Sequence, residues 1–262
     1  MTGNAPRVAL VTGAGSGFGR GIAYKFAKDG VAVVVADIVD KAGQETVDAI
    51  TSKGGKAIYV HCDVTKREDW DAALAATEQA FGGINFVINN AGWTYQSKPV
   101  LQTTDKDFDL CIDVNLKSIF HSVHVMLPAF RRTREKGGPA VMVNVASTAG
   151  IMGRPGLSWY CASKAAVISV TKNLSIEFGA EQIRFNAICP VIGNTGLKSK
   201  FVGELPEEAF LKTIPLGRCS EPEALTATPP PADIANSTCF LCTDEASFLT
   251  GVALPVDGGR LA

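Results

Sequence analysis

Residues 12–19 read Thr12-Gly13-Ala14-Gly15-Ser16-Gly17-Phe18-Gly19, directly after the apolar run Val8–Thr12. An amphipathic pattern typical of a helix follows from Gly17 to Lys28, and a second apolar run, Val31–Ala36, comes after it. Glycines in such a turn let the backbone bend sharply and approach a pyrophosphate, which the positive end of the helix stabilises. The stretch therefore predicts a dinucleotide-binding turn between a strand and a helix.

Short apolar runs alternate with helix-length segments along most of the remaining chain. Most of the runs are continuously apolar, which is typical of strands covered by helices on both faces of a parallel sheet. The alternation predicts a doubly wound α/β domain. The expected strands are Val8–Thr12, Val31–Ala36, Ala57–Val60, Phe86–Asn89, Val141–Val145, Ile183–Ile188 and Val252–Val256. The expected helices are Gly17–Lys28, Lys41–Ser52, Arg67–Phe81, Asp105–Arg132, Ser158–Gly179 and Ala232–Cys242.

The chain has 262 residues, of which 46% are hydrophobic. This length fits one large domain or two small ones, and the composition argues against a disordered chain or a disulfide scaffold. A formal net charge of −1 gives no broad basic surface for nucleic acid or an anionic membrane, so we expect a small-molecule partner. Seven cysteines beside apolar runs, with no signal-peptide pattern, favour the cytoplasm. No apolar run approaches the ~18 residues that a membrane span requires.

Asp37 follows the second apolar run, at close to the spacing of about 20 residues from Gly13 that is expected of the acid binding the adenosine ribose hydroxyls. Its charge would repel a 2′-phosphate, and no Arg or Lys follows until Lys41. The pattern favours NAD over NADP as the cofactor. The alternative interpretation is an exposed aspartate that caps the next helix, but Asp40 is better placed for that role.

Tyr160 and Lys164 lie four residues apart in a helical pattern, so their side chains share one face. Bringing the pKa of a phenol near 7 needs roughly 4 kcal/mol. A cation about 4–5 Å away supplies roughly 3–4 kcal/mol at an effective dielectric constant near 20. A Tyr-x-x-x-Lys pair by itself more often marks the solvent-exposed face of a helix than a catalytic site. Ser147 favours the functional interpretation, because it follows the run Val141–Val145 at the sheet edge where α/β proteins bind ligands.

With these motifs in order, the sequence resembles the classical short-chain dehydrogenase/reductase family over essentially the whole chain. The family implies a single Rossmann-type domain over residues 1–262, with a seven-stranded parallel sheet in the order 3-2-1-4-5-6-7, helices on both faces, and a homotetramer or homodimer. The resemblance rests on Thr12-Gly13-Ala14-Gly15-Ser16-Gly17-Phe18-Gly19, Asp63-Val64, Asn89-Asn90-Ala91-Gly92, Val114-Asn115-Leu116, Ser147, Tyr160-Cys161-Ala162-Ser163-Lys164 and Val256-Asp257-Gly258-Gly259.

The resemblance also implies a role for each matching catalytic residue. Tyr160 would act as the acid/base, and Ser147 would hold the substrate oxygen. Lys164 would bind the nicotinamide ribose and lower the pKa of Tyr160, while Asn115 would hold a water in a proton relay through Lys164. Asp63 would hydrogen-bond the adenine amino group. The cofactor-binding residues implied are Gly13, Ser16, Gly17, Phe18, Gly19, Asp37, Asp63, Val64, Asn90, Ala91, Gly92, Tyr160, Lys164, Pro190, Ile192 and Thr195.

Residues 190–231 break the alternation, because they are rich in Gly, Pro and Thr and end in Thr228-Pro229-Pro230-Pro231. We interpret this segment as a lid over a site, since long irregular segments in compact domains are usually functional. The alternative is a disordered insertion. The family usually has Pro-Gly where this chain has Pro190-Val191, so a branched side chain is expected beside the reacting carbon. The amide of Ile192 can still meet the nicotinamide.

The candidate substrate-pocket residues are mainly apolar and aromatic, which favours a hydrophobic ketone or secondary alcohol as the substrate. They are Trp93, Tyr95, Thr148, Met152, Trp159, Val191, Leu197 and Phe201.

We expect no metal site. Cys239 and Cys242 have metal-ligand spacing but lack a second pair and lie in an apolar helix, so core packing is the better interpretation. The histidines at 61, 121 and 124 have no surrounding ligand set and are interpreted as structural.

The sequence therefore predicts an NAD(H)-dependent oxidoreductase that interconverts a secondary alcohol and a ketone. Two alternatives stay open. One is a cofactor-binding protein of the same fold without turnover. The other is a redox-neutral epimerase or cyclase that retains its nicotinamide.

Overall fold

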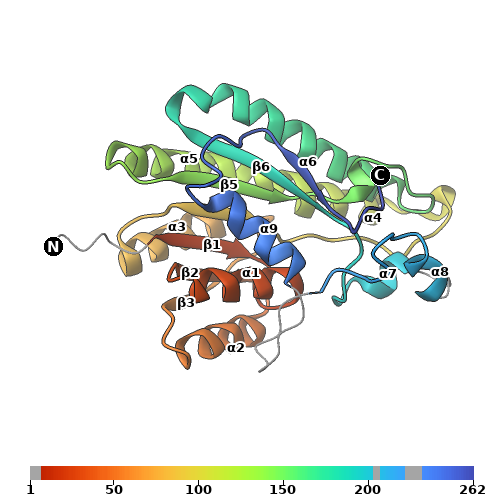
Figure 1. Cartoon of the computed structure of the whole chain (residues 1–262), viewed down its shortest axis with the longest axis horizontal. Coiled ribbons are helices and arrows are strands. Elements are labelled where there is room, and N and C mark those ends of the chain that lie inside the picture. The colour runs from red at the N-terminus through yellow and green to blue at the C-terminus, as the bar shows by residue number, and fades with distance from the viewer. Residues whose placement is uncertain (1–6, 203–206, 222–231) are drawn as a thin grey trace.

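The computed structural model describes residues 7–202, 207–221 and 232–262. Its centre is a seven-stranded sheet in which neighbouring strands pair in parallel, in the order β3-β2-β1-β4-β5-β6-β7 (Figure 1). This arrangement confirms the expected fold class and strand order. The strands are β1 (Val8–Thr12), β2 (Ala32–Asp37), β3 (Ala57–His61), β4 (Phe86–Asn89), β5 (Ala140–Val145), β6 (Ile183–Pro190) and β7 (Ala253–Val256).

Helices cover both faces of the sheet. Successive side chains of a strand point to opposite faces, so that Val33 and Val35 of β2 pack in one core cluster, and Val34 and Ala36 in another. Residues of α1 (Gly17–Lys28), α2 (Asp40–Thr51) and α9 (Asp233–Cys242) complete the first cluster. Residues of α3 (Arg67–Phe81) and α5 (Ser118–Glu135) complete the second, and α6 (Ser158–Glu177) packs beside them against β6 (Figure 1). Burial on both faces explains why the strands are apolar runs without alternation.

None of the helices in the described part of the chain combines the length and the apolar composition needed to cross a bilayer.

The elements outside these two layers are shorter than the helices named above. The shorter elements are α4 (Asp105–Ile112), α7 (Lys198–Val202), α8 (Glu207–Leu211) and the turns η1 (Val100–Gln102), η2 (Asp113–Lys117), η3 (Thr148–Gly150) and η4 (Gly179–Glu181).

The segment predicted as one helix, Asp105–Arg132, consists of two helices joined by a wider turn. A capping box between Thr104 and Asp107 begins α4. The π-helical turn η2 follows, and α5 then runs on to Glu135. The chain stays helical through such a turn, which only widens locally. The apolar pattern of the sequence therefore continues across it and does not indicate where α4 ends and α5 begins. The turn contains Asn115, which is 2% exposed.

Asp40 does not cap α2, although the sequence placed it well for that role. It is the first residue of the helix, with Val39 at the N-cap position. Its carboxylate instead accepts a hydrogen bond of 2.7 Å from the hydroxyl of Tyr59 and lies 2.7 Å from Nδ1 of His61. These bonds, the Tyr59 bond foremost, lower the pKa of Asp40. The parallel pairing of β2 with β3 brings Tyr59 and His61 beside Asp40. The local sequence pattern does not predict which residues of the two strands lie side by side.

The segment 190–231 is described only in part. Its described residues include α7, α8 and a bridge between Gly193 and Ser220. The predicted Thr228-Pro229-Pro230-Pro231 end lies outside the described residues.

A chain of buried polar side chains ties β4, β5 and α6 together. Nδ2 of Asn89 donates to Oδ1 of Asn144 (2.8 Å), and Nδ2 of Asn144 donates to the hydroxyl of Thr171 (2.9 Å). The Thr171 hydroxyl in turn donates to the carbonyl oxygen of Val167. A polar group that is buried without a hydrogen-bond partner costs free energy, so these bonds are favourable. The bonds therefore fix the position of α6 against the two central strands.

We expect Asn144→Ala to lower the free energy of unfolding by about 1–3 kcal/mol, because the amide of Asn89 is then buried without its acceptor. Asn173→Ala is the matched control, since Asn173 lies on α6, the helix that carries Thr171, and its side chain bonds only at the exposed surface. The control should change stability by less than about 0.5 kcal/mol. Urea unfolding of both variants measures the difference, and equal losses would contradict the argument.

Candidate active site

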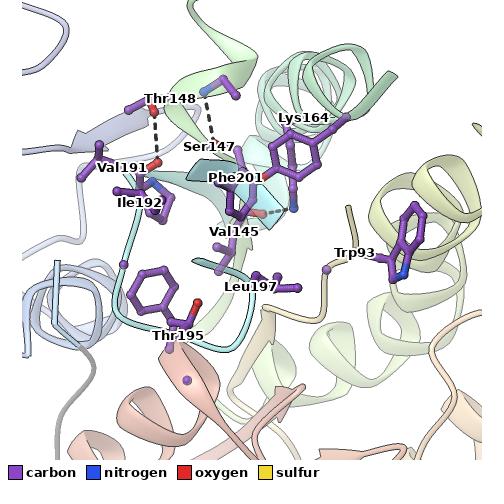
Figure 2. A pocket seen from close by; sticks show the side chains of 18 of the residues that line it. Trp93, Val145, Ser147, Thr148, Lys164, Val191, Ile192, Thr195, Leu197 and Phe201 are labelled. Carbon is purple, nitrogen blue, oxygen red and sulfur yellow. Dashed lines mark hydrogen bonds between the residues drawn. The ribbon is translucent and has the colours of Figure 1, made fainter. Parts of the chain in front are cut away.

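A cavity of about 440 Å³ opens at the carboxyl ends of the strands (Figure 2). Its wall combines the glycine turn after β1 with residues that follow β4, β5 and β6 and with residues of α6 and α7. The predicted residues in the wall are Gly13, Ser16, Gly17, Phe18, Asp37, Asn90, Ala91, Gly92, Trp93, Ser147, Thr148, Met152, Tyr160, Lys164, Pro190, Val191, Ile192, Thr195, Leu197 and Phe201.

The glycine turn is held close to the strand beside it. Gly13 has φ +62°, a left-handed conformation that favours glycine. A Cβ on Gly19 would lie 2.2 Å from the carbonyl oxygen of Gly13, so no larger residue fits there without movement. Nδ2 of Asn90 donates to the carbonyl oxygen of Thr12 (2.7 Å), which joins the turn to the end of β4. Gly19 thus shapes the turn from behind and does not itself line the cavity.

Asp37 ends β2 at the cavity wall and is 8% exposed. Its Oδ2 accepts a hydrogen bond of 2.7 Å from the amide of Gly15, and its Oδ1 accepts one of 2.9 Å from the amide of Val39. Charged acceptors make the stronger hydrogen bonds, so the carboxylate is firmly oriented beside the glycine turn. This position suits the recognition of a ribose diol.

Arg20 is a cation near the turn that the sequence search missed, because only residues after Asp37 were considered. It lies on α1, one helical turn beyond Ser16, so helical spacing could have found it. Its guanidinium already donates to the hydroxyl of Thr46 (3.0 Å) and to the carbonyl oxygens of Gly15 and Ala42. These bonds to the protein reduce its capacity to bind an added phosphate.

Ser147, Tyr160 and Lys164 meet at the same cavity. Ser147 is the N-cap of η3, and its hydroxyl accepts from the amide of Ala149 (3.1 Å). Nζ of Lys164 donates to the carbonyl oxygen of Val145 (2.8 Å), as Figure 2 shows, and lies 5.9 Å from the centroid of the Tyr160 ring. All three predicted residues are at least nine-tenths buried. The site therefore holds a phenol, a hydroxyl and an amine out of bulk water.

Burial governs the acid–base properties of these groups. It raises the pKa of Tyr160 to about 12, and a hydrogen bond with Ser147 opposes the rise by a smaller amount. It lowers the pKa of Lys164 to about 8, because a buried ammonium loses its hydration. Burial therefore outweighs any effect of the Lys164 charge on the pKa of Tyr160, whereas the spacing of the two residues indicated that one lysine is nearly sufficient to bring that pKa near 7. Near neutral pH the phenol is protonated and Lys164 is mostly charged.

Asn115 stands behind the cavity wall. Its Oδ1 accepts from the amide of Trp93 (2.8 Å), and its Nδ2 donates to the carbonyl oxygen of Trp93 (2.9 Å) and to the hydroxyl of Ser163 (3.0 Å). Oδ1 of Asn115 and Nζ of Lys164 each lie 3.5 Å from the point where a Cβ on Gly92 would stand. The two side chains are therefore neighbours across Gly92, although Asn115 does not line the cavity.

Four further predicted residues lie outside the cavity wall. Asp63 accepts hydrogen bonds from the amide and hydroxyl of Thr65, which occupy Oδ1, and Val64 is buried in the core. The hydroxyl of Tyr95 accepts from the backbone amide of Trp159 (3.2 Å), and both residues belong to the same hydrophobic cluster. Tyr95 and Trp159 do not line this cavity, because a place near a strand end in the sequence does not fix the direction of a side chain.

The cavity wall also contains residues that the sequence search missed. Two are arginines, Arg154 and Arg260, and a third is Phe210. A signal for the arginines was present, since Arg154 lies between Ser147 and Tyr160, and Arg260 directly follows the motif that ends at Gly259. Among the described residues, no three His, Cys, Asp or Glu side chains are grouped as metal ligands.

The chain is similar to known enzymes along its whole length. Residues 13–260 match a family model described as enoyl-(acyl carrier protein) reductase. A 4-formylbenzenesulfonate dehydrogenase of Comamonas testosteroni is 44% identical, with 97% of each chain covered. A cyclohexanol dehydrogenase of an Acinetobacter species is 36% identical, with 96% of this chain and 94% of the relative covered.

The fold of this chain is also similar to solved structures of named reductases. A 3-ketoacyl-(acyl-carrier-protein) reductase from Brucella melitensis, complexed with NADH, is 38% identical and superimposes with a TM-score of 0.89 over 98% of both chains. Levodione reductase is 30% identical, with a TM-score of 0.87 over 97% of both chains. These relatives support oxidoreductase activity with a nicotinamide cofactor. The fold, the motifs and the full-length matches together show that this chain belongs to the short-chain dehydrogenase/reductase family.

Proposed function

We propose that the protein is an NAD(H)-dependent oxidoreductase that interconverts a secondary alcohol and a ketone on a largely hydrophobic small molecule. The observation that carries the proposal is the convergence of Ser147, Tyr160 and Lys164 on the cavity that also contains Asp37. Dehydrogenases acting on an alicyclic alcohol and on an aryl aldehyde among the relatives support an alcohol or carbonyl substrate.

A bound nicotinamide would supply the hydride acceptor for alcohol oxidation and the hydride donor for carbonyl reduction. The chain supplies the proton. In the reducing direction the hydroxyl of Tyr160 donates its proton to the carbonyl oxygen, and in the oxidising direction the phenolate takes the alcohol proton. The raised pKa of Tyr160 keeps the phenol protonated near neutral pH, which suits the reducing step. The hydroxyl of Ser147 donates to the substrate oxygen and holds it at the phenol.

Lys164 has a separate task. Its ammonium, fixed on the carbonyl oxygen of Val145, places a positive charge beside the Tyr160 ring. That charge stabilises the phenolate formed when the proton leaves. Its remaining N–H donors are available to the ribose of the cofactor, and Asn115 lies on the far side of Gly92, behind the cavity wall.

The cofactor preference follows from Asp37. A carboxylate that two backbone amides orient accepts hydrogen bonds from ribose hydroxyls and repels a 2′-phosphate. Arg20 is the nearby cation that would counter this repulsion, but its Nε and Nη2 are bonded to the protein, and the Glu45 carboxylate lies 3.7 Å from Nη2. NAD is therefore the proposed cofactor.

We expect Tyr160→Phe to lower kcat by a factor of about 100 to 10,000, because it removes the transferable proton and leaves the ring in place. NADH binding, followed by fluorescence, should survive. Tyr24→Phe is the control, since Tyr24 lies on α1 and does not line the cavity. Turnover is measured by NADH absorbance with a panel of ketones and secondary alcohols. Full activity of Tyr160→Phe contradicts the mechanism, and a wild-type protein inactive on the whole panel contradicts the function.

We expect Asp37→Ala to reduce the NAD-over-NADP preference in kcat/KM by about tenfold or more, the value of one or two charge-assisted hydrogen bonds. Asp40→Ala is the matched control, because this neighbouring carboxylate pairs with Tyr59 and His61 outside the cavity. Steady-state kinetics with both cofactors decide the matter. An unchanged ratio in Asp37→Ala rules out Asp37 as the discriminating residue.

A further inference from the structure

Two arginines from distant parts of the sequence line the cavity that holds Tyr160. Arg154 lies in the loop between η3 and α6, and Arg260 follows β7 near the end of the chain. The proposed oxidation and reduction use neither of them. Their presence is unexpected beside the predicted substrate-pocket residues, which are mainly apolar and aromatic and favour an apolar substrate.

Aromatic rings connect the two guanidinium groups to the acid/base. The ring centroids of Tyr160 and Phe201 are 5.2 Å apart, and Cζ of Arg154 lies 5.7 Å from the Phe201 centroid. Cζ of Arg154 is also 5.4 Å from the centroid of Phe210, and Cζ of Arg260 is 4.6 Å from the same centroid. Both guanidinium groups therefore converge on one ring, and one aromatic side chain separates Arg154 from Tyr160.

The two charges lack a carboxylate partner among the described residues. Nη2 of Arg154 donates to the carbonyl oxygen of Phe201 (2.6 Å), and Nη1 of Arg260 donates to the hydroxyl of Thr213. Asp257 is the acid with an electrostatic influence on Arg260. Its two oxygens already accept from the amides of Gly259 (3.0 Å) and Leu261 (2.9 Å). Since a guanidinium has five N–H donors, each arginine keeps donors for a ligand.

The pair carries an electrostatic cost in the absence of an anion. Burial, and next the charge of Arg260, lower the pKa of Arg154. Like charges that are partly desolvated repel each other, and an anion placed between them removes the repulsion and fills the unused donors. Guanidinium groups suit carboxylate and sulfonate because several N–H donors can bind one oxyanion.

We propose that Arg154 and Arg260 form an anion subsite, so that the substrate is an aryl alcohol or ketone carrying a carboxylate or sulfonate about one ring away from the reacting oxygen. This inference rests on the proposed function, since it extends the substrate of the same cavity. The apolar residues Leu197, Val191 and Phe201 contact the ring of the substrate, and the arginines bind its charged end. The expectation of a purely hydrophobic substrate is thereby narrowed to an amphipathic one.

The first test measures binding, which does not require turnover. Isothermal titration of the NADH-loaded protein compares benzenesulfonate and benzoate with the neutral methyl phenyl sulfone and benzamide. We expect the anions to bind at least about tenfold more tightly, the effect of one charge-assisted pair. Equal affinity for anions and neutral analogues overturns the proposal.

The second test assigns the effect to the arginines. Arg154→Met and Arg260→Met, made separately, should each reduce the preference for the anion by about tenfold, and Arg154→Lys should retain part of it. Arg132→Met is the control, because Arg132 is exposed and pairs with Glu78 outside this cavity. Circular dichroism and thermal unfolding verify that each variant is folded. If Arg154→Met does not fold, Arg260→Met still decides, and an unchanged preference in it overturns the proposal.

A turnover arm separates this inference from the proposed function. It follows NADH formation from 1-phenylethanol and from 4-(1-hydroxyethyl)benzoate. Oxidation of both alcohols at equal kcat/KM contradicts the anion subsite and leaves the proposed function intact. Arginine-dependent binding of benzoate without oxidation of either alcohol, or of any other in the panel, supports the subsite and contradicts the proposed function.

Discussion

Parallel pairing of the strands is the constraint on which the site depends. When every neighbour in a sheet runs the same way, all carboxyl ends reach one edge, and each strand delivers its next residues to the same place. Thr12, Asp37, Asn90, Ser147 and Pro190 are far apart in the sequence, yet each stands at or just beyond a strand end on that edge. The helices on both faces leave that edge as the open side. A cavity whose wall contains both the proposed nucleotide-binding groups and the proposed catalytic groups is the direct consequence.

Precision at this edge comes from polar groups buried behind it. Asn144 bonds to the neighbouring strand and to α6, so that the helix carrying Tyr160 and Lys164 is held against the strand leading to Ser147. Asn115 similarly fixes the backbone at Trp93 from the π-helical turn. Such bonds contribute little net stability while they are intact but are costly to break in the interior. They therefore favour a single arrangement of Ser147, Tyr160 and Lys164.

The cavity joins two chemical environments. At the glycine turn a carboxylate and backbone amides suit a ribose and a pyrophosphate. Around Phe201 and Phe210 the wall is aromatic, but two guanidinium groups stand among the rings. An apolar wall alone selects by shape and area, and its discrimination between similar molecules is modest. Charged donors in a partly desolvated pocket discriminate more sharply, because a ligand that leaves them unpaired loses the full interaction.

The sequence by itself determined the features written in short, regular patterns. These include the strand and helix order, the glycine turn, the acid that ends the second strand, and the Tyr160 and Lys164 pair on one helical face. Only the tertiary structure decided what depends on packing between distant segments. It placed Tyr95 outside the cavity wall, interrupted the helix at Asp113–Lys117, raised the pKa of Tyr160 by burial, and brought Arg154 and Arg260 onto one ring. The periodicity of a sequence indicates which face of a helix or strand is buried. How the elements pack then decides which residues meet at that face and which charges remain without a partner.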